Sequence, residues 1–218
     1  FAQGILYTLL LSVVAVALAV LPALGLALMR LSKNKVLRGL SGAYIALFRS
    51  TPLLVQLALI YYGLFGVAGI QLPSVYVLGY TNLAQFVPGA VALALNSAAY
   101  VAEIFRGGIL AVDKGQMEAA RSLGLTQWQG MKFVVLPQAI KNILPALANE
   151  VITMVKESSI CSTYGMMELM WGAKTVAATT YVTLGPYVLA AIIYFCVNFP
   201  ASKAIEAVER RMRRGDNQ

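Results

Sequence analysis

The sequence predicts an all-α integral membrane protein with five transmembrane helices. Of its 218 residues, 59% are hydrophobic and only 12% are charged, and the mean hydropathy is +0.73. A soluble domain of this length carries a larger charged fraction. Long charge-free stretches recur along the chain, and cationic residues gather between them. We therefore expect residues 1–218 to form a single transmembrane domain.

The positions of the spans follow from apolar length. Residues 4–29 carry no charge over 26 positions; as a helix they measure about 39 Å, and the hydrocarbon core is about 30 Å thick. Residues 50–102 also lack charge and can hold two spans. A loop is expected between these two at 69–82, where Pro73, Ser74 and Gly79 interrupt the apolar run. The expected spans are 4–29, 52–70, 84–105, 137–158 and 184–202.

The distribution of cations predicts the topology. With these spans, the loops on one side (30–51, 106–136 and 203–218) hold fourteen Lys and Arg, whereas the loops on the other side hold only Lys174. Cationic loops stay in the cytoplasm, so we expect the N-terminus outside and the C-terminus inside. The same rule, with anionic membrane lipid as the partner, accounts for the net charge of +8. We therefore expect no nucleic-acid partner.

Several kinds of active site are excluded by residue usage. The chain has no His, which removes His-based catalytic triads and the usual zinc sites. Its two cysteines, Cys161 and Cys196, lie in different apolar segments and give neither a disulfide framework nor metal-ligand spacing. No phosphate-binding GxxxxGK[ST] loop occurs. We expect a chain that is not an enzyme and that holds no metal and no cofactor of its own.

One polar loop, about residues 111–136, interrupts the apolar segments. Asp113 can cap the start of a short helix, Gly124 suits the position just past its end, and Thr126 with Gln129 can form the capping box of a second helix. On the first helix, the small residues Ala119 and Ala120 leave one side without bulk, so that a partner backbone can approach closely. The alternative is a helix that lies in the headgroup plane, anchored by residues such as Trp128, Met131 and Phe133.

This loop resembles the EAA loop of ABC importer permeases, whose pattern is Glu-Ala-Ala, three residues, Gly, nine residues, Ile, any residue, Leu-Pro. Here the pattern runs from Glu118 to Pro137, with Val134 in place of Ile. Three longer stretches resemble the polar amino acid subfamily, the permeases of histidine, glutamine and arginine uptake systems. They are FRSTPLLVQLALIYYGL (48–64), NSAAYVAEIFRGGILAVDKGQ (96–116) and LPQAIKNILPALANEVITMVKESSI (136–160). Ser50 departs from the subfamily, which usually has Gly there.

The resemblance implies the five-helix type I ABC importer permease fold in the cytoplasmic membrane of a prokaryote. It also implies a complex of two permease subunits, two cytoplasmic ATP-binding subunits that hold ATP and Mg²⁺, and an extracytoplasmic amino-acid-binding protein. The polar loop is then the coupling helix that docks on the ATP-binding subunit. The residues assigned to this coupling are Glu118, Ala119, Ala120, Arg121, Leu123, Gly124, Leu136 and Pro137.

Polar groups at membrane depth are costly, so they mark a candidate substrate pathway. The candidates are Thr51, Gln56, Asn96, Tyr100, Glu103, Glu150, Thr153 and Lys156. An amino acid zwitterion needs an acceptor for its ammonium and a cation for its carboxylate, which Glu150 and Lys156 can supply. Structural alternatives stay open. Glu103 can pair with Arg106 one turn on, Lys156 can neutralise a carboxylate on another helix, and Asn96 can join two helices.

The predicted function is the membrane-spanning subunit of an ATP-driven importer for a polar or basic amino acid of the arginine, lysine, histidine or glutamine class. An ATP-independent channel or carrier is the alternative, because intramembrane Lys and Glu residues serve it equally well. A third possibility is a partner permease whose own pore site is vestigial. The sequence decides neither the substrate nor whether the permease dimer is homomeric or heteromeric.

Overall fold

The computed structural model describes residues 1–70, 72–77 and 81–214. Gly79 of the expected 69–82 loop and the tail residues 215–218 lie outside the described residues. Apart from one short hairpin, in which β1 (Tyr76–Val77) pairs antiparallel with β2 (Thr81–Asn82), the described chain is helical. The long helices are α1 (Ala2–Leu31), α2 (Lys35–Ser50), α4 (Leu83–Leu110), α7 (Leu136–Glu157) and α9 (Leu184–Arg214). The all-α prediction is confirmed.

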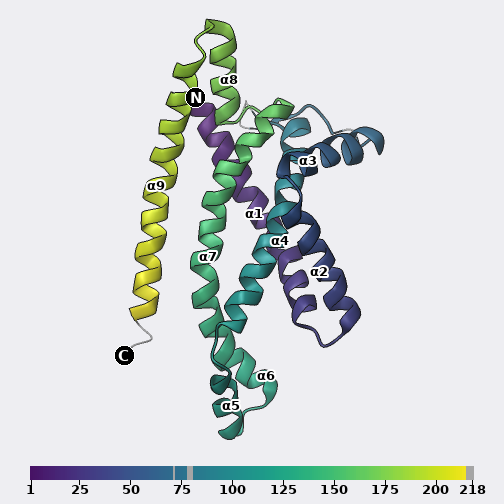
Figure 1. Cartoon of the computed structure of the whole chain (residues 1–218), viewed down its shortest axis with the longest axis vertical. Helices are drawn as coiled ribbons and strands as arrows, with labels where there is room; N and C mark the ends of the chain where they lie inside the picture. The colour runs from purple at the N-terminus through teal and green to yellow at the C-terminus, as the bar shows by residue number, and fades with distance from the viewer. Residues whose placement is uncertain (71, 78–80, 215–218) are drawn as a thin grey trace.

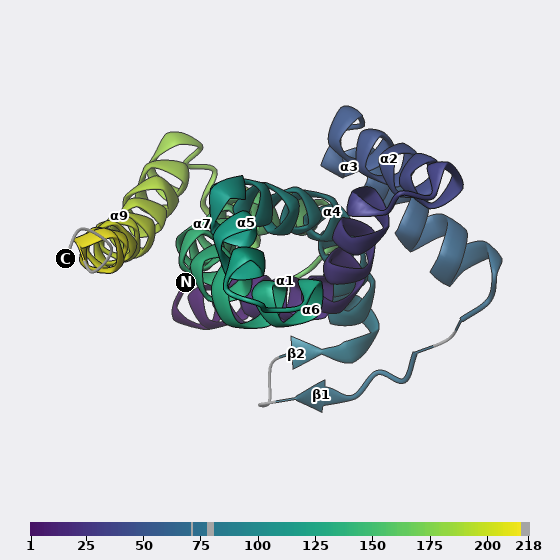
Figure 2. The ribbon, with the colours of Figure 1, turned by 90° about the horizontal axis from the view of Figure 1, so that it is seen from below.

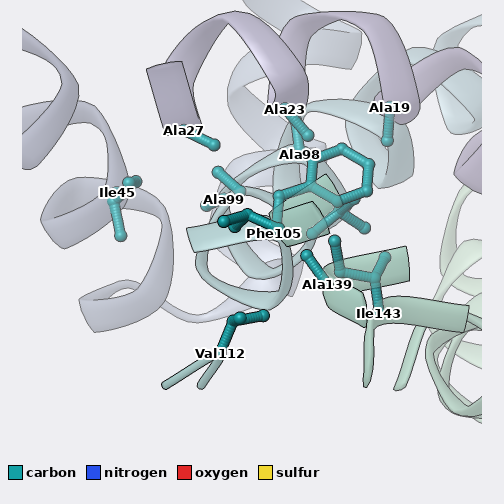
Figure 3. Close-up of a cluster of buried hydrophobic side chains, with 13 residues drawn as sticks. Ala19, Ala23, Ala27, Ile45, Ala98, Ala99, Phe105, Val112, Ala139 and Ile143 are labelled. Atoms are coloured by element: carbon teal, nitrogen blue, oxygen red, sulfur yellow. The ribbon is translucent and has the colours of Figure 1, made fainter. Parts of the chain in front are cut away.

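Helices α1 and α4 form the centre of the molecule. Ala19, Ala23 and Ala27 recur every four residues on α1 and are fully buried. They meet a second small-residue surface on α4, which includes Ala98 and Ala99 (Figure 3). In a bilayer the hydrophobic effect does not drive helices together, so close packing between small residues supplies much of the attraction. The alanine seam thus explains why these two helices pair.

The remaining helices surround this pair. Helix α7 packs on α4 and α1, and α8 (Leu169–Thr180) packs against α9 at the end where the N-terminus lies (Figure 1). Seen from the opposite end, α9 lies on one flank of the α1–α4–α7 core and the pair α2 and α3 (Leu53–Ala58) lies on the other (Figure 2). The C-terminal end of α9 points toward the end that carries α5 (Lys114–Ser122) and α6 (Gln127–Gly130).

The expectation that residues 30–51 form a loop is wrong. Most of this segment is helix α2, which packs on α1 and α4. Asn34 caps its start by accepting a hydrogen bond from the Val36 N–H at 2.9 Å. Ser41 is fully buried and donates a hydrogen bond to the Leu26 carbonyl at 2.7 Å. The four cations within 30–38 suggested a loop. They lie at the end of α1, at the start of α2 and in the short turn of residues 32–34 that connects the two helices.

The expected second span, 52–70, is also different from the observed helices. Helix α2 ends at Ser50, and α3 with the π-helical segment η1 (Leu59–Val67) leaves at 106° to it. Pro52 causes the break, because it lacks an N–H and disfavours the helical conformation at the residue before it. Thr51 accordingly has extended backbone angles, φ −113° and ψ 145°. The 106° bend makes α2 and α3–η1 either a broken span or a re-entrant loop.

Three described helices are long and apolar enough to cross a membrane: α1, α4 and residues Leu184–Met212 of α9. The bent pair raises the number to four if it forms one span. Helix α7 has 22 residues, which is the length of a span, but it carries Lys141, Glu150, Lys156 and Glu157. Its hydropathy is correspondingly low, and the predicted number of five spans is therefore not confirmed.

Candidate functional site

The polar loop between α4 and α7 has well-defined helix ends. Asp113 caps α5 by accepting a hydrogen bond from the Gly115 N–H at 2.7 Å. Gly124 has φ 87°, and the next residue, Leu125, donates its N–H to the Ala120 carbonyl at 3.1 Å. This arrangement is a Schellman C-cap, as predicted for Gly124. Both hydrogen bonds of the predicted capping box at Thr126 are present. The loop is thus a fixed helix–turn–helix.

Only part of the alanine surface of α5 faces outward. Ala119 is exposed, but Ala120 is 3% exposed and packs toward Gly130 of α6. The expectation that both alanines are available to a partner is therefore wrong for Ala120, whose small side chain instead lets α5 and α6 pack closely. The exposed apolar side chains here are Leu123, at 85% exposure, and Trp128, at 72%.

The rest of the EAA-like residues link the loop to α7. Glu118 and Arg121 are exposed on α5, and Leu136 and Pro137 form the first turn of α7. The Gln138 side chain of α7 donates a hydrogen bond to the Gln116 side chain of α5 at 3.1 Å. The segment η2 (Met131–Val135) continues from α6 directly into α7. Helical backbone therefore continues without a break from α6 into α7.

Three predicted pathway residues meet at the break between α2 and α3. The Gln56 amide donates to the Phe48 and Thr51 carbonyls and to the Thr51 hydroxyl at 2.8–3.0 Å. These contacts satisfy carbonyls that the end of α2 leaves free. Asn96 of α4 donates to Gln56 Oε1 at 2.8 Å, while its own Oδ1 is buried without a hydrogen-bond partner. We call Thr51, Gln56 and Asn96 the polar node.

Glu150 lies beside the polar node. Its side chain is buried, with 7% exposure, and accepts a hydrogen bond from the Ser97 hydroxyl at 2.9 Å. Ser97 follows Asn96 on α4, so the hydrogen bond to Glu150 lies at the same level of α4 as the polar node. Among the described residues, no Lys or Arg forms an ion pair with Glu150. Sequence reasoning missed Ser97, because a lone serine in an apolar helix carries no distinctive signal.

Tyr100 and Glu103 lie one and two turns further along α4. They line a cavity of about 440 Å³ with Arg30 and Arg49. Glu103 is bound to Arg106, with Nη2 to Oε2 at 2.6 Å, which is the ion pair that the sequence allowed as an alternative. Arg49 lies over the Tyr100 ring, 5.3 Å from its centre. The sequence analysis did not single out Arg49, because it placed this residue in a cytoplasmic loop.

The other two predicted residues do not join this site. Thr153 donates its hydroxyl to the Asn149 carbonyl one turn before it. Lys156 is exposed and lines a separate cavity against α9, with Tyr187 and Tyr194. Glu150 and Lys156 are six residues apart on a helix, which turns their side chains to different faces. The hypothesis that these two residues hold one zwitterion is therefore not supported by the geometry.

The sequence matches a known family over most of its length. The family model described as the binding-protein-dependent transport system inner membrane component covers residues 15–214. The chain belongs to this family. The permease is thus a non-catalytic membrane component of a binding-protein-dependent ABC transporter. No cluster of three or more potential metal ligands occurs among the described residues.

The permease is similar to transport proteins of known type. It is 41% identical to a putative glutamine transport system permease protein of Rickettsia bellii (strain RML369-C), over 96% of this chain and 91% of that protein. It is 39% identical to the arginine transport system permease protein of Bacillus subtilis (strain 168), over 98% and 93%. The predicted membership of the polar amino acid permeases is confirmed.

Solved structures agree with the fold. One chain of a crystal structure of an amino acid ABC transporter with histidines is 47% identical and superposes with a TM-score of 0.86, covering 97% of this chain and 93% of that one. An inward-facing MetNI methionine ABC transporter gives a TM-score of 0.71 at 22% identity, with 95% of each chain covered. The second similarity concerns the fold alone.

The end of the permease opposite the EAA-like loop holds a buried acid that sequence reasoning also missed. Glu168 is fully buried and caps α8, accepting hydrogen bonds from the Met170 and Trp171 N–H groups at 2.8 and 2.6 Å. Tyr194 of α9 donates to it at 3.0 Å. Burial raises the pKa of Glu168 to about 7, although these hydrogen bonds oppose the shift. The carboxyl group thus joins α8 to α9.

Proposed function

We propose that the permease forms the translocation pathway of an ATP-driven importer for a basic or polar amino acid of the arginine, lysine, histidine or glutamine class. The names of the similar glutamine and arginine permeases support an amino acid substrate. The observation that carries the proposal is Glu150, a buried carboxylate at membrane depth that has no cationic partner among the described residues.

The chemistry of the polar node favours a cationic group. An ionised carboxylate is strongly disfavoured in a low-dielectric interior unless a cation or several hydrogen bonds compensate it. Glu150 receives one hydrogen bond, from Ser97, and the neighbouring Asn96 Oδ1 receives none. These two acceptors, one on α4 and one on α7, each suit an ammonium or guanidinium group, which supplies several donors and a positive charge. A basic amino acid is therefore the substrate that fits best.

The proposed topology has five spans with a revised second member. The spans are α1, the bent pair of α2 with α3–η1, α4, α7 and α9. The N-terminus lies outside and the C-terminus in the cytoplasm. In support, α5, α6 and the C-terminal end of α9 lie toward one end of the molecule, and α8 and the N-terminus lie at the other (Figure 1). The buried Glu150 of α7 is then accounted for as a pathway residue.

We further propose that α5 and α6 dock on the ATP-binding subunit. A buried seat for these helices in a second protein explains why Leu123 and Trp128 are so exposed at the tip of the molecule. A second permease subunit and an extracytoplasmic binding protein complete the transporter, and ATP with Mg²⁺ is held by the ATP-binding subunits.

The substrate is tested by uptake into proteoliposomes that contain the complete transporter. Glu150→Gln removes the charge but keeps the shape, so we expect arginine uptake to fall about 10- to 100-fold, the value of a hydrogen bond to a charged group. Ser97→Ala is the matched control, because it removes the Ser97 hydroxyl and keeps the carboxylate; uptake should fall much less. Wild-type arginine uptake by Glu150→Gln would refute the role of this carboxylate.

The docking site is tested by co-purification with the ATP-binding subunit. Leu123→Asp places a charge in the proposed contact and should abolish co-purification, whereas Val36→Asp, at an exposed apolar residue in the first turn of α2, should not. Substrate flux through the purified permease without the ATP-binding subunit would favour the ATP-independent channel or carrier.

A further inference from the structure

Arg49 stands out as a cation beside the middle of α4 that forms no ion pair among the described residues. It is the second-last residue of α2, where the bent pair approaches the middle of α4. Its guanidinium lies over the Tyr100 ring at 5.3 Å, and among the described residues it forms no ion pair. Charged residues inside a membrane protein are expensive, so an arginine that is left without a carboxylate needs another explanation.

The cavity beside Arg49 is positively charged. Arg30 and Arg49 both line it, and Glu103 is the single acid in its wall. Glu103 is already engaged, because it accepts hydrogen bonds from Arg106 Nε and Nη2 at 2.6–3.1 Å. Glu103 attracts Arg30 and Arg49 only at longer range, so the cavity, of about 440 Å³, holds two guanidinium groups that form no ion pair with a described carboxylate. Its chemistry selects an anionic group.

The cavity adjoins the polar node along α4. Asn96, whose Oδ1 has no partner, and Tyr100, on which Arg49 stacks, are four residues apart. Four residues of α-helix rise about 6 Å, slightly more than one turn, so the two side chains share a face. The ammonium and carboxylate groups of an α-amino acid are attached to the same carbon. When each group makes one hydrogen bond, the protein groups that bind them can lie about 6 Å apart, which is the spacing of Asn96 and Tyr100 along the helix.

We infer that Arg49 binds the α-carboxylate of the transported amino acid while Asn96 and Glu150 receive its cationic groups. This inference rests on the proposed function. A guanidinium presents two parallel N–H donors that match a carboxylate, and stacking on an aromatic ring holds its plane in place. Lys156, which the sequence suggested for this role, lies on the α9 side of α7, away from the node. The polar node and Arg49 together recognise both ends of the substrate backbone.

The test compares arginine with agmatine, which keeps both cationic groups of arginine and lacks the carboxylate. Binding of each compound is measured on the complete transporter in nanodiscs, without the binding protein. The wild-type transporter should bind arginine about 10- to 100-fold more tightly than agmatine, as expected for a charge-assisted hydrogen-bonded pair. Arg49→Gln should remove this preference by weakening arginine alone, and Arg49→Lys should restore part of it.

Arg38→Gln is the matched control, because it removes the same charge from an exposed position of α2 that does not line the cavity. It should keep the preference for arginine. The inference is overturned if Arg49→Gln keeps the preference, if it weakens arginine and agmatine equally, or if Arg38→Gln also removes the preference. If the wild-type transporter binds neither compound, the proposed basic substrate is wrong, and the role inferred for Arg49 is wrong as well. Loss of tightly bound anionic lipid in Arg49→Gln, with arginine binding unchanged, would assign the cavity to lipid phosphate.

Discussion

Gly124 is held in a conformation that other residues avoid. Its φ of 87° lies in the left-handed region, and the Leu125 N–H bond to Ala120 depends on it. A β-branched residue there costs about 1–2 kcal/mol. We expect Gly124→Val to loosen the turn between α5 and α6 and to reduce ATP-driven uptake, measured in proteoliposomes. Gly124→Asn is the control, because Asn tolerates this region. Full uptake by a correctly assembled Gly124→Val transporter would contradict the prediction.

Glu168 predicts a pH dependence of stability. Its pKa of about 7 in the folded protein lies above the ordinary value of 4.5, so the folded state favours the protonated form. The contribution is fully present below pH 4.5 and is lost as the pH rises through 7, by about 3 kcal/mol in total. The facing titratable groups are Tyr7 of α1, Cys161 of η3 (Ser158–Tyr164), Lys174 of α8 and Tyr194 of α9.

We therefore expect the melting temperature in detergent to be higher at pH 5 than at pH 8. Glu168→Gln keeps an oxygen acceptor for the N-terminus of α8 and removes the titration, so this difference should shrink. Glu118→Gln, at an exposed carboxylate of α5, should leave the difference unchanged. The same pH dependence in Glu168→Gln and the wild type would show that another group is responsible.

At the scale of helices, the contact between α4 and α7 depends on one glycine. A Cβ atom at Gly108 would overlap Ile143 Cγ1 of α7, whereas one at Gly107 would meet nothing within 4 Å. We expect Gly108→Ala to destabilise the permease by about 1–3 kcal/mol, as for an overpacked core. Gly107→Ala should be neutral or slightly stabilising, because Ala favours helix. Thermal unfolding in detergent measures both, and equal effects would contradict the packing argument.

The sequence predicted helices where local signals agree with tertiary structure. Asp113, Gly124, Thr126 and Gln129 act within a few residues, so the ends of the helices in the polar loop were predictable. Helix α2 was not predicted, because its cations are typical of a loop. The helix is stabilised by long-range contacts, such as the hydrogen bond from Ser41 to the Leu26 carbonyl. The candidate site was predictable only in part for the same reason. Polar residues at membrane depth were recognised, but their partners come from helices that a single sequence does not place.

At the scale of the whole molecule, the two candidate sites are connected by α4 and α7. The polar node and Glu150 lie within these helices, and α5 with α6 joins their ends (Figure 1). Because η2 continues into α7 as one helical path, a force on the exposed tip acts on the helix that carries Glu150. The proposed docking site and the proposed substrate site are thus physically separate but are connected by the same two helices.

This arrangement requires that α5 and α8 lie on opposite sides of the membrane, which cysteine labelling can test. The background replaces Cys196, which is exposed, and Cys161, which is buried, by Ser. A membrane-impermeant maleimide applied to intact cells should label a cysteine at Thr179, on the exposed part of α8, and should reach one at Ser122 of α5 only after the membrane is opened. The reverse pattern would contradict the proposed orientation.

The same labelling decides whether the bent pair is a span. Lys33 precedes α2, and Val67, at 89% exposure, ends η1. If α2 and α3–η1 cross the bilayer together, a cysteine at Val67 should be labelled from outside, like Thr179, and one at Lys33 only from inside, like Ser122. The five crossings are then α1, the bent pair, α4, α7 and α9. Labelling of both positions from the inside would make the pair a re-entrant loop and would contradict the proposed five spans, because α4 would then begin and end on the same side as Lys33 and Ser122.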